Sequence, residues 1–258
     1  MNIDGIEIKW LGHSGFLISN STPSYEDDLQ EQRSQAYTKE AQEPLRGPDK
    51  SSTKISTRGI IYIDPYNIKE GMEKADLILI THSHYDHCSV ADMNKVIKKG
   101  TKIIISADAQ SKVTRFDTPV DIEIVESGDE LSFGEFDISV LPAYNIDKPF
   151  HPKAEGWLSY LIKIGNVLIY HAGDTDVIPE MQKLTGYHQS NKKIIALLPV
   201  GGRFTMSVEE AVEAAELIKP FLAVPMHYGG VVGAIDNAED FVKLCEEKGI
   251  DAKILEKE

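Results

Sequence analysis

The feature that most constrains this chain is a cluster of metal-binding residue types directly after an apolar run. Residues 81–88 read Thr-His-Ser-His-Tyr-Asp-His-Cys and follow the apolar residues 77–80. Imidazole nitrogens and carboxylate oxygens suit zinc and its neighbours in the periodic table. A dense patch of them at the end of a strand adds little to packing, so we predict that His82, His84, Asp86 and His87 bind metal.

Three residues of the same types lie later in the chain. His151 stands in Lys-Pro-Phe-His-Pro-Lys, whereas Asp174 and His227 each follow a strand-like apolar run, at 167–170 and 221–224. Because α/β proteins gather functional groups at strand ends, we expect Asp174 and His227 to reach the edge where the first cluster lies. The first cluster alone leaves the number of metal ions open, and these residues supply the further ligands.

The order of these motifs resembles that of the metallo-β-lactamase superfamily over nearly the whole chain. The matching segments are Trp-Leu-Gly-His-Ser at 10–14, Ile-Asp-Pro at 63–65, the histidine cluster, Ala-Gly-Asp at 172–174, Leu-Pro-Val-Gly-Gly at 198–202 and Pro-Met-His-Tyr at 225–228. Within the superfamily, the chain looks most like metal-dependent hydrolases of the ascorbate 6-phosphate lactonase-like group. The resemblance implies a four-layer αββα sandwich, in which two mixed sheets pack face to face with helices outside.

The resemblance also implies how the ligands divide between two metal ions. One ion would take His82, His84 and a histidine from a later loop, while the other would take Asp86, His87 and His227, and Asp174 would bridge them. Relatives carry the loop histidine in Pro-Ala-Phe-His or Pro-Ala-Tyr-His, but this chain reads Pro-Ala-Tyr-Asn at 142–145. An amide oxygen is a weak, neutral zinc ligand, so we assign the role to His151 and expect Asn145 to support a ligand or contact substrate. We expect His13 to support the centre through a hydrogen bond rather than as a ligand.

Such a centre implies hydrolysis. Two ions lower the pKa of a bridging water, polarise the scissile group and stabilise the leaving oxygen, and Asp86 could orient that water as a catalytic residue. No Gly-x-Ser-x-Gly segment suggests a serine nucleophile. We therefore predict a metal-dependent hydrolase that uses a metal-bridging hydroxide on a small ester, lactone or phosphate-containing metabolite. Zinc is the expected ion, although manganese and iron share these ligands. Lys148 and Arg203 lie near the motifs and are candidates for binding a phosphate or carboxylate of the substrate.

Two alternatives stay open. The superfamily also contains phosphodiesterases and ribonucleases, but a net charge of -14 and the lack of a basic patch argue against long nucleic acid as a partner. The same ligands could hold two irons in a redox protein, or metal without catalysis. Redox members normally carry a flavin domain, which 258 residues do not accommodate.

Composition fits a single α/β domain over residues 1–258. The chain is 41% hydrophobic, and its two cysteines, Cys88 and Cys245, are far apart, so no disulfide or thiolate site is implied. With no leader-like segment and no long apolar run, we expect an unprocessed, cytoplasmic protein with no membrane partner; self-association stays open. Residues 20–57 are polar and interrupt the strand pattern, and could be a solvated loop, a lid or a contact surface.

Periodicity places strands and helices in alternation. Strands are expected at 6–18, 59–63, 76–81, 102–106, 121–125, 130–133, 135–141, 194–199, 221–225 and near 254, with a hairpin over 157–170 that turns at Gly165-Asn166. Helices are expected at 89–100, 207–218 and 237–248, the second with a capping box of Ser207 and Glu210. By itself this pattern supports only a mixed-sheet α/β or α+β fold.

Overall fold

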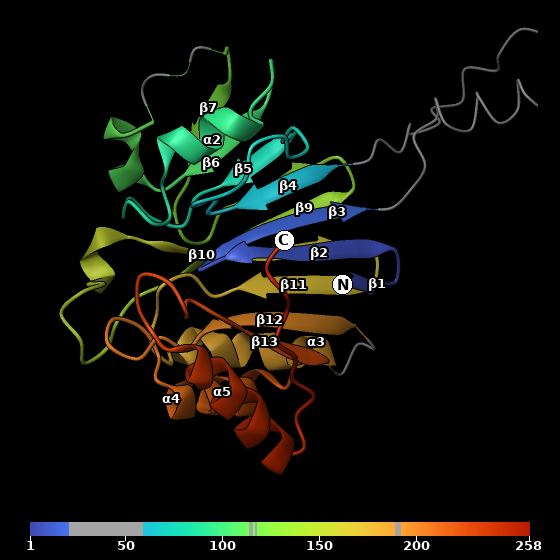
Figure 1. Cartoon of the computed structure of the whole chain (residues 1–258), viewed down its shortest axis with the longest axis vertical. Coiled ribbons are helices and arrows are strands. Elements are labelled where there is room, and N and C mark those ends of the chain that lie inside the picture. The colour runs from blue at the N-terminus through green and yellow to red at the C-terminus, as the bar shows by residue number, and fades with distance from the viewer. Residues whose placement is uncertain (21–58, 114–115, 117, 189–191) are drawn as a thin grey trace, which may run out of the picture.

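Two mixed sheets face each other in the computed structural model, which describes residues 1–20, 59–113, 116, 118–188 and 192–258 (Figure 1). The first sheet follows the order of the sequence: β1 (Asn2–Ile3), β2 (Ile6–Gly12), β3 (Gly15–Asn20), β4 (Ile60–Ile63), β5 (Leu77–Leu79), β6 (Lys102–Ile105) and β7 (Asp121–Ile124). Its strands are antiparallel from β1 to β4 and parallel from β4 to β7.

The second sheet repeats this plan. It contains β8 (Glu130–Phe133), β9 (Phe136–Pro142), β10 (Leu158–Ile164), β11 (Val167–His171), β12 (Lys193–Pro199) and β13 (Leu222–Met226), in sequence order from one edge to the other. The strands are antiparallel from β8 to β11 and parallel from β11 to β13. In both sheets, therefore, carboxyl ends of neighbouring parallel strands meet at one edge.

Helices cover the outer faces of both sheets. α2 (Val90–Val96) lies against the first sheet, and α4 (Val208–Ile218) and α5 (Ile235–Glu247) lie against the second (Figure 1). Shorter helical segments are α3 (Thr185–His188), η1 (Ala107–Ser111), η2 (Lys153–Glu155) and η3 (Pro179–Leu184). The predicted four-layer αββα arrangement is confirmed.

Strand β5 shows why its sequence is apolar at every position. Leu77 and Leu79 join the core between the two sheets, whereas Ile78 and Ile80 join a second core that contains Met93 of α2. A strand buried on both faces has no solvent side on which polar residues would be favoured. The cluster at 82–87 begins where this continuous burial ends.

Most predicted elements are confirmed, including the hairpin of β10 and β11 and the capping box of Ser207 and Glu210. Two predictions need correction. α2 ends at Val96 rather than near Gly100, because Ile97 already has an extended backbone. No strand forms near Ile254 in this described segment, because the chain there passes from β13 to β2 and makes one isolated bridge at each, Ala223 to Ala252 and Trp10 to Lys257.

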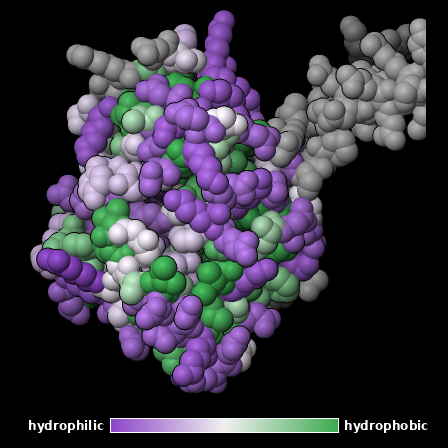
Figure 2. All heavy atoms as spheres, in the orientation of Figure 1, coloured by the Kyte–Doolittle hydropathy of each residue, from purple (hydrophilic) through white to green (hydrophobic). Residues whose placement is uncertain are grey.

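The predicted insertion at 20–57 lies outside the described residues except for Asn20. The described residues on either side of 21–58 are joined, since the Asn20 side chain accepts a hydrogen bond from Gly59 N at 2.7 Å. The face shown in Figure 2 is mainly hydrophilic, with hydrophobic residues scattered over it. None of the helices in the described part of the chain has the length and apolar character needed to cross a lipid bilayer.

Candidate metal centre

All the predicted ligands lie in loops at one edge of the two sheets. The segment 82–87 follows β5, Asp174 follows β11, and His227 follows β13 directly, while His151 lies in the loop between β9 and β10. Parallel strands bring their carboxyl ends to a common edge, which explains why residues so far apart in sequence meet. The site therefore draws on both sheets.

The first group of ligands consists of His82, His84 and His151. One nitrogen from each lies within 4.8 Å of the others, and His82 Nε2 is 3.0 Å from His84 Nδ1. Ligand nitrogens of one tetrahedral zinc ion, each about 2.0–2.1 Å from the metal, have a comparable separation. The indole of Trp157 packs against all three rings at centroid distances of 4.8, 4.9 and 5.1 Å. These contacts restrict the rotation of the three imidazoles.

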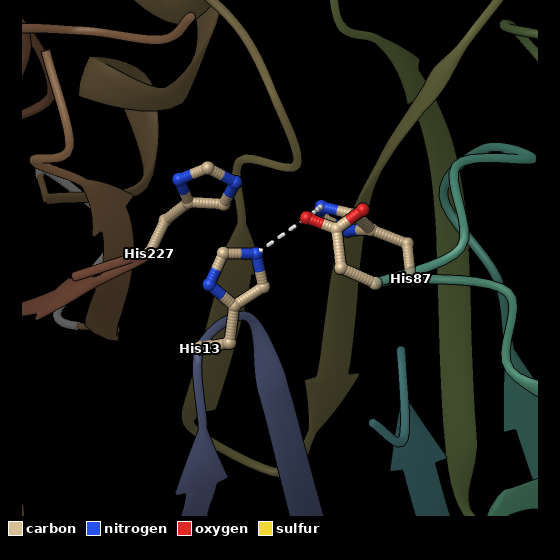
Figure 3. Close-up of side chains that lie close together, drawn as sticks. His13, His87 and His227 are labelled. Carbon is tan, nitrogen blue, oxygen red and sulfur yellow. Dashed lines mark hydrogen bonds and ion pairs between the residues drawn. The ribbon is translucent and has the colours of Figure 1, made fainter. Parts of the chain in front are cut away.

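The second group consists of Asp86, His87 and His227, and His13 lies with them. One ligand atom from each of the four falls within 4.8 Å of the others. Figure 3 shows the rings of His13, His87 and His227 gathered from three separate segments, with a dashed line for the 2.9 Å bond between His13 Nε2 and Asp86 Oδ2. The expected hydrogen-bonding contact of His13 is thus present, and it is made to Asp86.

Asp174 lies between the two groups. Its Oδ2 is 3.3 Å from His151 Nε2 in the first group and 3.1 Å from His227 Nε2 in the second, and its Oδ1 is 3.4 Å from His87 Nε2. Gly173 allows this position, since it has a φ of +63° and a Cβ there would lie 2.6 Å from the Leu158 carbonyl oxygen. A single buried carboxylate therefore reaches ligands of both groups.

A second carboxylate, Asp64, orients one histidine of each group. Its Oδ2 is 2.8 Å from His87 Nδ1 and accepts the Thr81 hydroxyl at 2.6 Å. The same hydroxyl oxygen is 2.9 Å from His82 Nδ1. With Nδ1 of each ring held by these oxygens, Nε2 is the nitrogen of His82 and His87 that can bind a metal ion. The sequence indicates Asp64 only as part of the motif at 63–65, where its position between an apolar strand and a proline is the signal that marks it.

The loop residue Asn145 supports His151. Asn145 Oδ1 accepts the backbone N–H of His151 at 2.9 Å and is 3.0 Å from its Nδ1, which is also 3.0 Å from the Phe204 carbonyl oxygen. Its side-chain amide donates to Asp176 and to the Phe204 carbonyl oxygen. Asn145 thus contacts His151 Nδ1, on the side of the ring opposite to the group of ligands.

Several buried polar atoms in the centre have no hydrogen-bond partner within the described residues. They include His13 Nδ1, His87 Nε2, Asp174 Oδ1 and both ring nitrogens of His227. A buried polar atom without a partner costs about 1–3 kcal/mol, so such a cluster needs an explanation. Metal ions bound by imidazole nitrogens and carboxylate oxygens supply one, and the donor set therefore fits them.

Burial and charge set the protonation of the centre. Burial lowers the pKa of His13 to about 4, so this ring is neutral at pH 7. Burial would raise the pKa of Asp86, but the hydrogen bond with His13 and the neighbouring His87 outweigh it and bring that pKa to about 2. For His87, Asp174 and Asp64 outweigh burial and raise the pKa well above its ordinary value. Metal binding must therefore displace a proton from His87.

A cavity of about 470 Å³ opens beside the centre. Asp86, His151, Asp174 and His227 line it, together with Arg203. The third predicted substrate contact, Lys148, is bound elsewhere: its ammonium group is 2.5 Å from Asp176 Oδ1 and 2.9 Å from Glu210 Oε2. The apolar lining was not foreseen, although Tyr85, Phe150 and Phe204 each adjoin a predicted site residue in the sequence.

Comparisons with known proteins show the family of this chain. Residues 48–227 match the family described as beta-lactamase superfamily domain. The chain belongs to the beta-lactamase superfamily. Among relatives in this superfamily, a UPF0173 metal-dependent hydrolase of Thermococcus kodakarensis is 30% identical, with 94% of this chain and 93% of the relative covered. One from Archaeoglobus fulgidus is 28% identical over 97% and 95% of the two chains.

Two solved structures of metallo hydrolases share the fold. A putative metal-dependent hydrolase of Parabacteroides distasonis is 26% identical and superposes with a TM-score of 0.69, over 98% of this chain and 94% of that one. Igni18, a metallo hydrolase of Ignicoccus hospitalis, has a TM-score of 0.66 at 23% identity over 98% and 95%. Both likenesses extend over nearly the entire chain, so the superfamily fold accounts for both sheets. The narrower resemblance to the ascorbate 6-phosphate lactonase-like group stays a prediction.

Proposed function

We propose that this superfamily member is a metal-dependent hydrolase with two metal ions, acting on a small ester, lactone or phosphate-bearing metabolite. The observation that carries the proposal is the position of Asp174, whose two carboxylate oxygens lie within 3.4 Å of histidines from both ligand groups. A structural metal site is usually closed by four ligands around one ion, whereas this arrangement borders an open cavity. The relatives named metal-dependent hydrolases support the same reaction class.

Each residue would have a definite part in holding the ions. His82, His84 and His151 would hold one ion, Asp86, His87 and His227 the other, and Asp174 would bind both. When bound, the pair of ions would supply Lewis acidity toward the substrate oxygen and a nucleophilic water at neutral pH. Zinc suits this mixture of imidazole and carboxylate ligands best, although manganese and iron bind the same atoms.

Asp86 is the catalytic carboxylate in this proposal. It lines the cavity, and the hydrogen bond of its Oδ2 with His13 leaves Oδ1 available to a water molecule. With a pKa of about 2, Asp86 stays ionised and holds a proton poorly. The carboxylate is therefore suited to orienting the attacking water by accepting its hydrogen bond. In the overall reaction, the water oxygen joins the acyl or phosphoryl product and a proton ends on the leaving oxygen.

The size of the cavity favours a small substrate. Its volume of about 470 Å³ is in the range of small-molecule sites. The net charge of -14 opposes approach of a polyanion, which makes the phosphodiesterase or ribonuclease alternative weaker for long nucleic acid. A soluble cytoplasmic location and a single domain over 1–258 remain part of the proposal.

The decisive experiment compares the wild type with Asp174→Ala. The wild type, purified without added metal and then reconstituted, should contain two metal equivalents by elemental analysis and hydrolyse ester, lactone or phosphate substrates. Asp174→Ala should lose at least one equivalent and nearly all hydrolysis, because no other described residue contacts both groups through one carboxylate. Asp251→Ala, at an exposed position after α5, is the matched control and should behave as the wild type.

Other outcomes separate the alternatives. Full metal content and full activity in Asp174→Ala would refute the two-ion scheme. Two irons without hydrolysis of any substrate would favour a redox or non-catalytic metal protein. Cleavage of RNA or phosphodiesters alone would favour the nuclease alternative.

A further inference from the structure

The cavity beside the metal centre has an apolar wall. Besides the candidate ligands, it is lined by Tyr85, Phe150, Phe204, Val231 and Val232. Tyr85 is 62% exposed, Val231 40% and Phe150 38%. Single exposed apolar residues are ordinary on proteins, but several around one cavity indicate a surface that a ligand covers.

Two of these aromatic rings form an ordered wall. Phe150 and Phe204 meet edge to face, with centroids 4.7 Å apart and ring planes at 90°. The guanidinium carbon of Arg203 lies 5.0 Å from the centre of the Phe204 ring. Stacking on an aromatic ring holds a guanidinium in place while its N–H groups can still donate hydrogen bonds. The cavity thus combines an apolar wall with one positioned cation.

Arg203 has no charge partner in the part of the chain that the structure describes. Among the described residues, no carboxylate lies within ion-pairing distance of its guanidinium and no acceptor receives a hydrogen bond from it. Two nearby lysines differ in this respect. Lys148 is paired with Asp176 and Glu210, and Lys153 is paired with Glu180. In a chain of net charge -14, an arginine that faces a cavity without a carboxylate partner is available to an anionic ligand.

We infer, building on the proposed function, that the substrate is an amphipathic anion. Its apolar part, an aryl or branched alkyl group, would cover Phe150, Phe204 and Val231. A carboxylate or phosphate at one end would bond Arg203, and the bond to be hydrolysed would lie at the other end, beside Asp86 and Asp174. Arg203 then sets the preference for a charged substrate. Asn145 and Lys148 instead bind other residues of the protein.

The test uses three aryl esters of equal length that end in a carboxylate, a phosphonate or a neutral carboxamide. The metal-loaded wild type should hydrolyse at least one of the anionic esters with a kcat/KM about 10- to 100-fold above that of the carboxamide, the range expected for a charge-assisted hydrogen bond. The comparison of carboxylate with phosphonate identifies the anion. Arg203→Gln should abolish the preference by raising KM for the anionic esters more than for the carboxamide. Arg203→Lys should keep part of the preference, because it retains the charge without the planar fork.

Lys99→Gln is the matched control for net charge. Lys99 is exposed beyond α2 and is not among the residues that line the cavity, so its removal should leave the preference unchanged. Equal rates for the three esters in the wild type would overturn the inference. So would an equal loss on all three esters in Arg203→Gln, which would indicate a structural role.

Binding measured by calorimetry separates this inference from the proposed function. The probes are 4-phenylbutyrate and phenylphosphonate, which carry no hydrolysable bond. Affinity that falls about 10-fold or more in Arg203→Gln supports the inference even if no ester is hydrolysed, in which case the proposed function fails alone. Affinity that is unchanged in Arg203→Gln shows capture of the anion by the metal ions only and overturns the inference, even if ester hydrolysis is rapid.

Discussion

At the scale of single residues, the centre depends on which nitrogen of each histidine is held by the protein. Asp64 and Thr81 hold the Nδ1 atoms of His87 and His82, and Asn145 holds that of His151. Because the protein occupies Nδ1 of these three rings, Nε2 of each is the nitrogen that could bind a metal ion. Residues that orient the ligands are therefore nearly as important for metal affinity as the ligands themselves.

Variants of the loop between β9 and β10 test this division of roles. His151→Ala should lower the metal content at saturation, because it removes a ligand atom. Asn145→Ala should keep full content but weaken affinity by about 10- to 100-fold, because it frees the imidazole from its orienting partner. Titration against a competing chelator measures both quantities. If Asn145→Ala lost an ion at saturation while His151→Ala kept both, the two roles would be reversed.

The sequence predicts the residue types of the candidate metal ligands better than the contacts that hold those ligands in place. Histidines and aspartates that cluster after an apolar strand can be recognised as candidate metal ligands, because few other functions need them together. The pairing of Lys148 with Asp176 and Glu210 cannot be predicted from the sequence. Those partners are 28 and 62 residues away, and only the folded loops bring them close. Lys148 therefore resembled a substrate contact in sequence, although the fold uses its charge.

At the scale of elements, strand ends position the ligands and short polar contacts fix the loops behind them. The start of α2, just after the histidine cluster, is tied to the turn at 67–68 through Asp92. This carboxylate accepts hydrogen bonds from Asn67 N, Ile68 N, the Ser89 hydroxyl and the Lys95 ammonium. The contacts connect α2 to the segment after β4 that carries Asp64.

The variant Asp92→Asn measures what this connection contributes. Burial would raise the pKa of Asp92, but the bonds from Lys95, Ser89 and the two backbone N–H groups lower it below its ordinary 3.8. A carboxyl whose pKa falls on folding adds stability above its unfolded pKa, and the stability is lost as the pH falls through the folded pKa. The free energy of unfolding of Asp92→Asn should therefore be about 1–3 kcal/mol lower than that of the wild type at pH 7. The difference should shrink below about pH 4.

Urea unfolding of metal-free protein between pH 7 and pH 3 gives this comparison. Asp251→Asn, at an exposed position, should match the wild type throughout. A deficit of constant size down to pH 3 would mean that the ionised form of Asp92 is not what stabilises the loop.

At the scale of the whole molecule, the candidate centre lies where two sheets that share an apolar core meet at one edge. Its ligands follow β5 in the first sheet and β11 and β13 in the second. Ions that bind only the folded arrangement stabilise it by mass action, by about 2.7 kcal/mol when one ligand is present at 100 times its Kd.

Removal of metal should therefore lower thermal stability. For a chain of this length, 2.7 kcal/mol corresponds to a fall in Tm of roughly 5–10 °C. Calorimetric scans with saturating zinc and with a chelator measure the difference. Asp174→Ala should show a smaller shift than the wild type, and an unchanged Tm on chelation would contradict a centre that bridges the sheets.

The alternation of strands and helices was sufficient to predict mixed sheets, but their pairing into two similar halves came from the family resemblance. Local periodicity shows which residues are buried, yet it does not show whether β9 pairs with β10 or crosses to the first sheet. Residues 250–258 illustrate this limit of periodicity. Their apolar positions suggest a strand, but the segment makes only two isolated bridges, one to β13 and one to β2.

The position of His227 directly after β13 has a consequence for biogenesis. A ribosome makes the chain from the N-terminus, so the segment 82–87 is synthesised long before its last partner. Until β13 joins the second sheet, the segment 82–87 lacks His227, the last of its proposed partners. In the proposed scheme, the complete set of ligands would be present only after β13 has been synthesised, so loading with metal would belong to a late stage of folding.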